Sequence, residues 1–90
     1  MSVQLNIHRT HRNLTNNQEV VEVTGDSVGA CLNDLVQKHP GMKEKLFDKK
    51  GKLINVIEIF LNNESTYPDE LKKPVKDGDE IYIALHLAGG

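Results

Sequence analysis

The 90-residue chain has one cysteine and no tryptophan, and no long apolar run. The single Cys31 excludes an internal disulfide, and its place on an apolar helical stripe predicts a buried structural thiol rather than a nucleophile. No apolar stretch approaches the ~18 residues of a membrane span. The start of the chain, Met1-Ser2-Val3-Gln4, lacks the basic and apolar segments of a signal peptide. We therefore expect a cytoplasmic protein that does not contact a membrane.

Neither sign of charge dominates, because 11 basic and 13 acidic residues give a formal net charge of −2. Such a balance favours neither nucleic acid nor an anionic membrane as a partner. Lysines gather between Lys43 and Lys52, and again at Lys72, Lys73 and Lys76. Acidic residues interrupt both groups, so we interpret them as solvated faces.

The sequence shows no arrangement typical of a catalytic or metal site. His8 and His11 are three residues apart, but the first predicted strand ends between them, so regular geometry does not place them on one face. The acidic run at 77–80 lacks the twelve-residue loop of a calcium site and predicts a hairpin turn. No glycine-rich loop precedes a helix, so no phosphate site is indicated. We expect no bound metal and no bound cofactor.

Apolar and polar residues alternate in four segments, which predicts half-buried strands. The segments are 3–7, 20–24, 57–61 and 81–85, and Val20 is counted with the apolar side of its strand. Residues 9–17 are polar and predict a loop that ends in an Asn16-Asn17 turn. Residues 64–71 are ambiguous, and a short edge strand or a loop is the favoured interpretation.

One amphipathic helix is predicted over 27–39, because apolar residues recur there with helical spacing. The stripe comprises Val28, Cys31, Leu32, Leu35 and Val36. Pro40 ends the helix, and 42–47 can add a short helical turn. The order strand, strand, helix, strand, short strand, strand predicts an α+β fold, with a mixed four- to five-stranded sheet and one main helix packed on one face. We expect a single domain over 1–86 and a flexible tail over 87–90.

Two surface features could serve a function. The first is the tail Leu87-Ala88-Gly89-Gly90, whose terminal glycines have no side chains and could enter a narrow channel. Extended, it would reach roughly 13–14 Å beyond the last strand. The second is a set of three residues on the predicted strands, Phe60, Tyr82 and Ala84. Because side chains alternate along a strand, these three point away from the helix. If strands 57–61 and 81–85 are neighbours, these three form an exposed apolar patch for a partner beside the root of the tail.

The chain resembles the ubiquitin-like β-grasp sulfur carriers. These include the small subunit of molybdopterin synthase, the thiamin sulfur carrier, and the carriers that feed cysteine or homocysteine synthesis. The resemblance covers nearly the whole chain. It rests on residues 27–35 of the helix, residues 59–64, and Val75-Lys76-Asp77-Gly78-Asp79-Glu80-Ile81 followed by Ala88-Gly89-Gly90. The Asp-Gly-Asp turn and the spacing from it to the tail are its specific elements.

The resemblance implies that Gly90 is the reacting residue, with Gly89 giving clearance and Leu87 and Ala88 completing the tail. An E1-like activating enzyme would use ATP to adenylate the Gly90 carboxylate. A sulfur donor or sulfurtransferase would convert the adenylate to a thiocarboxylate, and an acceptor biosynthetic enzyme would take the sulfur. The chain would then be a carrier and not itself an enzyme.

The same resemblance leaves two other functions open. The chain could be the small subunit of molybdopterin synthase, or a ubiquitin-like modifier joined through Gly90 to a lysine of a target. Molybdopterin-type tails usually carry a proline just before the final residues, and residues 83–87 contain none. The chain is also longer than typical thiamin carriers. Both departures favour a carrier that serves amino-acid synthesis, or an unassigned branch of the family.

Overall fold

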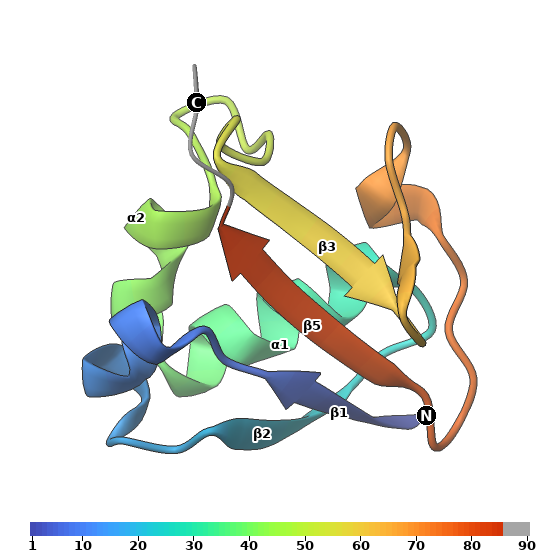
Figure 1. Cartoon of the computed structure of the whole chain (residues 1–90), viewed down its shortest axis with the longest axis horizontal. Helices are drawn as coiled ribbons and strands as arrows, with labels where there is room; N and C mark the ends of the chain where they lie inside the picture. The colour runs from blue at the N-terminus through green and yellow to red at the C-terminus, as the bar shows by residue number, and fades with distance from the viewer. Residues whose placement is uncertain (86–90) are drawn as a thin grey trace.

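The computed structural model describes residues 1–85, and its centre is a five-stranded sheet with the order β2-β1-β5-β3-β4. β1 and β5 are parallel and the other neighbours are antiparallel, so the sheet is mixed, as predicted (Figure 1). The strands are β1 (Ser2–Asn6), β2 (Val20–Thr24), β3 (Ile57–Leu61), β4 (Glu64–Ser65) and β5 (Glu80–Leu85). The ambiguous stretch 64–71, for which a short edge strand or a loop was expected, contains the edge strand β4 and the start of a 3-10 helix, η3 (Glu70–Lys72).

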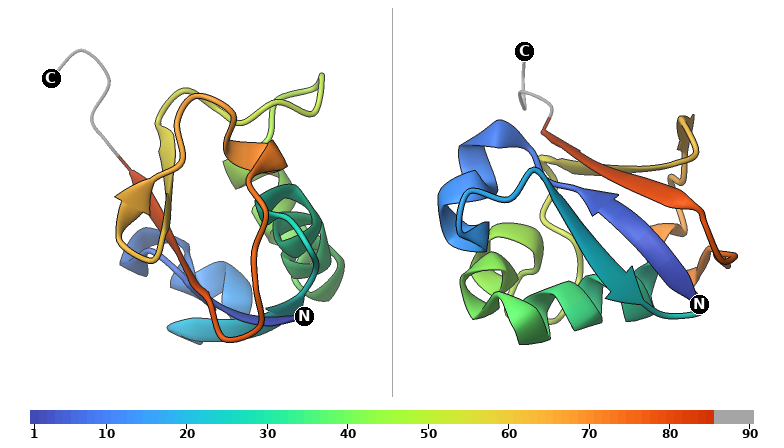
Figure 2. Two further views of the ribbon diagram at one scale, coloured as in Figure 1. Left: turned by 90° about the vertical axis from the view of Figure 1, so that its right-hand side faces the viewer. Right: turned by 90° about the horizontal axis from the view of Figure 1, so that it is seen from below.

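One main helix, α1 (Val28–Lys38), lies on one face of the sheet, and Figure 2 shows it entirely on that side. The Ser27 hydroxyl caps its first turn by accepting a 3.1 Å hydrogen bond from the Ala30 amide. His39 is the C-cap, and Pro40 begins the short 3-10 helix η2 (Pro40–Met42), which leads into α2 (Lys43–Leu46). The predicted helix over 27–39 therefore spans α1 and both caps.

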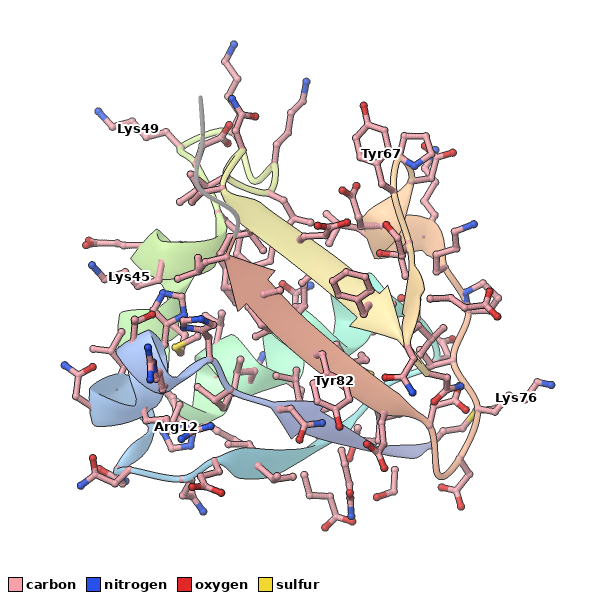
Figure 3. All side chains as sticks on the ribbon, viewed as in Figure 1. Arg12, Lys45, Lys49, Tyr67, Lys76 and Tyr82 are labelled. Atoms are coloured by element: carbon pink, nitrogen blue, oxygen red, sulfur yellow. The ribbon has the colours of Figure 1, made fainter. Side chains whose placement is uncertain are left out.

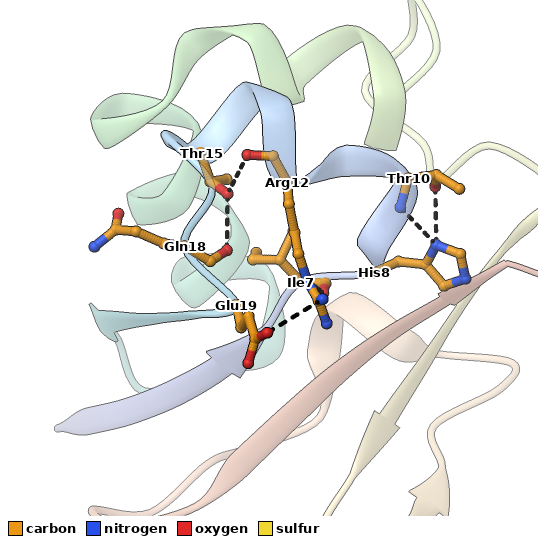
Figure 4. A network of polar contacts seen from close by, with 7 residues as sticks. All are labelled: Ile7, His8, Thr10, Arg12, Thr15, Gln18 and Glu19. Carbon is orange, nitrogen blue, oxygen red and sulfur yellow. Dashed lines mark hydrogen bonds and ion pairs between the residues drawn. The ribbon is translucent and has the colours of Figure 1, made fainter.

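The segment that we expected to be a polar loop contains the 3-10 helix η1 (Arg9–Thr15), so that expectation was wrong. Its buried side chains are His11 and Thr15, which are polar and leave no apolar periodicity in the sequence. The Thr15 hydroxyl is placed to donate to the carbonyls of Arg12 and Gln18, and Arg12 Nε donates to the Ile7 carbonyl (Figure 4). Local hydrogen bonds thus replace the apolar face of an ordinary helix. The Asn16-Asn17 turn that follows is left-handed, as expected.

The core lies between the inner face of the sheet and α1, and it is lined by alternate residues of the four longer strands. Cys31 is fully buried on α1, and this burial raises the pKa of its thiol above the usual value. That environment agrees with the expected structural role. The largest fully buried side chains come from the strands, from α1 and from the η2–α2 segment: Leu5, Ile7, Leu32, Leu35, Met42, Leu46, Ile59 and Ile81.

The predicted turn before β5 is held by two aspartates. Asp77 accepts a 2.8 Å hydrogen bond from the Ser2 amide, and Asp79 accepts from the Lys76 amide at 2.8 Å and from the Asn62 side chain at 3.0 Å. The Asn62 and Lys76 bonds lower the pKa of Asp79. Gly78 has φ of +89°, a left-handed conformation that suits glycine. The start of β5 is therefore fixed to β1 and to the end of β3.

Candidate functional site

The four predicted tail residues, Leu87, Ala88, Gly89 and Gly90, lie outside the described residues, so their expected roles stay predictions. The structure fixes the strand that precedes them. β5 lies between β1 and β3, and Leu85, its last residue, is opposite Ile57 at the start of β3. The position of the last described residue is thus set by its pairing with β3, while β1 pairs with β5 only as far as Tyr82.

The predicted patch residues lie on the sheet face away from α1, which we call the outer face. Phe60 and Tyr82 are directly opposite each other on β3 and β5, and Ala84 is two residues further along β5. Tyr82 is 40% exposed, while Phe60 and Ala84 are partly exposed. Figure 3 shows Tyr82 on this face. The structure therefore brings the three residues together and places Ala84 next to Leu85.

The exposed apolar surface extends further than the sequence prediction. Asn6 pairs with both Val20 and Tyr82, so Val20, Asn6, Tyr82 and Phe60 form a row across four strands, which we call the outer row. Val20 is 42% exposed. Counting Val20 with the apolar side of its strand was wrong, because Val21 faces the core and adjacent strand residues point to opposite faces. The adjacent valines were the signal that could have identified it.

A groove of about 670 Å³ runs beside the outer row and is lined by Phe60, Tyr82 and Ala84. Its other wall is polar and comes largely from the end of β1 and from η1: Asn6, His8, Arg9 and Arg12. Arg12 forms an ion pair of 3.5 Å with Glu19 (Figure 4). The groove thus joins an aromatic floor to a charged wall of two arginines and Glu19, at the end of β5 that precedes the tail.

Tyr82 also contacts the acidic side of this face. Its hydroxyl donates a 3.3 Å hydrogen bond to the Glu80 carboxylate. The negative charge of Glu80, together with this bond, raises the pKa of the phenol. The phenol is therefore neutral at physiological pH and presents a ring with a donor at its tip, the chemistry of many interface tyrosines.

His8 and His11 are closer than their sequence spacing suggested. Their ring centroids are 6.3 Å apart. His8 is the N-cap of η1, and residues three positions apart in a 3-10 helix lie one above the other, so His11 lies above His8. His8 Nδ1 is already engaged by Thr10. Within residues 1–85, no group of three or more His, Cys, Asp or Glu side chains is arranged to hold a metal ion. In the same part of the chain, no helix is long and apolar enough to cross a membrane.

The topology and the outer face define a class of small α+β protein. In this class one face of a mixed sheet packs against a helix, and the other face is partly apolar and exposed. The chain belongs to the ThiS family, whose model matches residues 6–90. Sulfur carrier protein CysO of Mycobacterium tuberculosis is 33% identical over 93 residues, which covers all of both chains. Small archaeal modifier protein 1 of Haloferax volcanii is 32% identical over 71 residues, which covers 78% of each chain.

A solved complex shows the same fold. The crystal structure of the Amycolatopsis orientalis BexX/CysO complex has a matching chain with a TM-score of 0.87 and 31% identity, covering 98% of this chain and 99% of that one. These matches confirm the ubiquitin-like β-grasp fold and the sulfur-carrier family that the sequence resembled. They also show that a relative with this fold forms a complex with another protein.

Proposed function

We propose that this chain is a sulfur carrier. Its Gly90 carboxylate is adenylated and then converted to a thiocarboxylate, which donates sulfur to a biosynthetic acceptor such as an enzyme of cysteine, homocysteine or cofactor synthesis. One observation carries the proposal: the ThiS-family match continues through Gly90, and a relative aligned over its whole length is a sulfur carrier protein.

The two chemical steps, adenylation and sulfur transfer, need no catalytic group on this chain. A carboxylate oxygen of Gly90 attacks the α-phosphate of ATP, and pyrophosphate leaves. Sulfide, delivered by a sulfur donor or sulfurtransferase, then attacks the acyl carbon, AMP leaves with the original oxygen, and a proton is released. The activating enzyme binds the ATP, so the carrier itself needs no bound cofactor.

Each part of the chain has a role in this scheme. Adenylation makes an unreactive carboxylate electrophilic, and Gly89 and Gly90 leave room for the partner's groups around the reacting carbon. Leu87 and Ala88 carry these glycines away from β5. The adenylating enzyme and the acceptor bind the outer face at Phe60, Tyr82 and Ala84, which adjoin the end of β5.

Intact-mass spectrometry of the protein from its native host tests the proposal. We expect a fraction whose mass is raised by one exchange of oxygen for sulfur, located at Gly90 by fragmentation. Deletion of Gly90 should abolish this species while the far-UV spectrum and thermal unfolding stay unchanged. Asn33→Ala, at an exposed position on α1 and away from the outer face, is the control and should still load. Sulfur loading that survives the Gly90 deletion would contradict the proposal.

A second function is favoured by the similarity to small archaeal modifier protein 1. In that case Gly90 would form an isopeptide bond with a lysine of a target protein, from the same adenylate. Trypsin digestion of host proteins would then yield branched lysine peptides bearing the C-terminal residues of this chain. Copurification with a large synthase subunit would instead indicate the molybdopterin synthase subunit considered above.

A further inference from the structure

The outer row separates two groups of opposite charge. On the side toward the start of β5, Gln4 pairs with both Glu22 on β2 and Glu80 on β5, so two carboxylates flank it. Glu22 is exposed, and Glu80 is partly exposed. We call Glu22 and Glu80 the acidic border of the outer row.

The other side of the outer row, toward the end of β5, is basic. Arg9 and Arg12 of η1, together with His8, line the groove beside Tyr82 and Ala84. Glu19 lines it too and pairs with Arg12, so among the described residues Arg9 carries the positive charge without an ion pair on this side. Arg12 is tied to the Ile7 carbonyl and to Glu19, while Arg9 is exposed and makes no ion pair within residues 1–85. We call Arg9 and Arg12 the basic border.

The charge pattern on this face is local, because the net charge of the whole chain is only −2. Long-range attraction between whole molecules therefore cannot select a partner here. Two borders of opposite sign on either side of this mostly apolar row can select a partner, because a partner turned the wrong way would place like charges together. The pattern is suited to setting orientation.

We propose that the outer row and its two borders dock the adenylating enzyme that receives the tail, a refinement that rests on the proposed function. The docking surface of that enzyme has an apolar strip, with carboxylates opposite Arg9 and Arg12 and with Lys or Arg side chains opposite Glu22 and Glu80. In this orientation the end of β5 points toward the enzyme's nucleotide site.

The position of the groove and the small exposed apolar area of the outer face both favour the adenylating enzyme over a second copy of the chain as the partner. The groove adjoins Ala84, the residue before Leu85, so a protein that takes up the tail must lie close to it. The large apolar side chains exposed by 40% or more on this face are Val20 and Tyr82. So small an apolar area suits a transient encounter better than a permanent homodimer, whose interface is larger and more hydrophobic.

ATP–pyrophosphate exchange by the cognate adenylating enzyme, measured against the concentration of the full chain, tests the docking. Arg9→Glu should raise KM by about tenfold and leave kcat unchanged, because it places like charges together at the interface. Lys76→Glu makes the same change in charge on the turn before β5, well away from Arg12 and η1 in Figure 3, and is the matched control. It should change KM less than about twofold. Added salt should shrink the effect of Arg9→Glu.

Glu22→Lys separates an oriented interface from simple attraction to an acidic protein. The oriented interface predicts a higher KM, although the variant is more positive, whereas simple attraction predicts a lower one. A lowered KM, or equal effects of Arg9→Glu and Lys76→Glu, would overturn the docking model. So would a wild-type dimer in light scattering that Arg9→Glu dissociates, because the occupant would then be a second copy. If the wild-type chain supports no exchange and carries no thiocarboxylate, the proposed function itself fails.

Discussion

His11 is a buried histidine whose Nδ1 atom has no hydrogen-bond partner within residues 1–85. Its side chain lies on η1 and is 6% exposed. Burial is the main cause that lowers its pKa, and the nearby His8 and Lys45 add to it. Every charged group that acts on the ring is therefore basic, so the fold favours the neutral imidazole.

The lowered pKa of His11 predicts stability that depends on pH. In the unfolded chain the ring takes up a proton near a pKa of about 6.5, whereas in the folded chain it does so only at lower pH. The unfolded state thus binds more protons in this window, and the free energy of unfolding should fall as the pH drops from 7.5 to 5. Urea unfolding at both pH values measures the change.

Two substitutions test whether His11 causes this pH dependence of the free energy of unfolding. His11→Gln should lose most of the difference between the two pH values, whatever its effect on stability at pH 7.5. Asn33→Gln, at an exposed position on α1 without an ionisable group, should keep the wild-type difference. An undiminished difference in His11→Gln would show that other groups cause it.

At the scale of elements, β2 is an edge strand whose free side is covered by α1. The Asp34 carboxylate accepts a 2.9 Å hydrogen bond from the Thr24 amide, and Lys38 Nζ donates a 2.8 Å bond to the Glu22 carbonyl. Asp34 and Lys38 also form an ion pair of 3.2 Å. Two outward-facing backbone groups of β2 are therefore already occupied, which hinders the edge from pairing with another chain.

Asp34→Ala should expose the Thr24 amide on the free side of β2. The Thr24 amide loses its acceptor, so we expect faster hydrogen exchange at Thr24 and a loss of about 1 kcal/mol in the free energy of unfolding. Asn33→Ala, one residue earlier on the same helix, removes an exposed side chain and should change neither. Because the Thr24 hydrogen bond lowers the pKa of Asp34, its stabilisation should be present above about pH 4 and decline as the pH falls through the lowered pKa. Unchanged exchange at Thr24 in Asp34→Ala would refute the role.

The elements that the sequence predicted are those with a regular apolar pattern. Alternation located the four longer strands, and the stripe through Cys31 and Leu35 located α1. The 3-10 helix η1 was missed because its buried side chains, His11 and Thr15, are polar and show no apolar pattern. Thr15 is held by bonds to backbone carbonyls, which the sequence does not display. Two residues, as in β4, are too few to show a period.

The candidate site was predicted in the same uneven way. Strand parity identified Phe60, Tyr82 and Ala84, because parity depends only on local geometry. It could not show that Val20 and Arg9 lie on the same face, since that depends on the strand order and on η1. Pairing between β1 and β5, which are far apart in sequence, brings those residues together.

At the scale of the whole molecule, one face of the sheet lines the core, and the other is the face that we propose for recognition. Ile83 and Tyr82 are neighbours on β5, and Ile83 is buried against the core while Tyr82 is exposed. Ile83→Ala should lower the free energy of unfolding by about 2–5 kcal/mol, because it leaves a cavity. Tyr82→Ala removes a side chain that is 40% exposed and lies opposite Phe60 on the neighbouring strand, and it should cost about 1 kcal/mol or less.

Chemical denaturation of both variants measures these costs, and the exchange assay measures their effect on docking. We expect Tyr82→Ala to raise KM although it stays folded, and Ile83→Ala to leave KM unchanged under conditions where it remains folded. The reverse pattern would show that the outer face is structural rather than a recognition surface.

The central position of β5 also has a mechanical consequence. A partner that draws on the chain beyond Leu85 pulls along the axis of a strand paired on both sides, with β1 and with β3. Such a force loads several hydrogen bonds at once in shear, instead of peeling them one after another. The end of the chain can thus be held under tension inside another protein without unravelling the domain behind it.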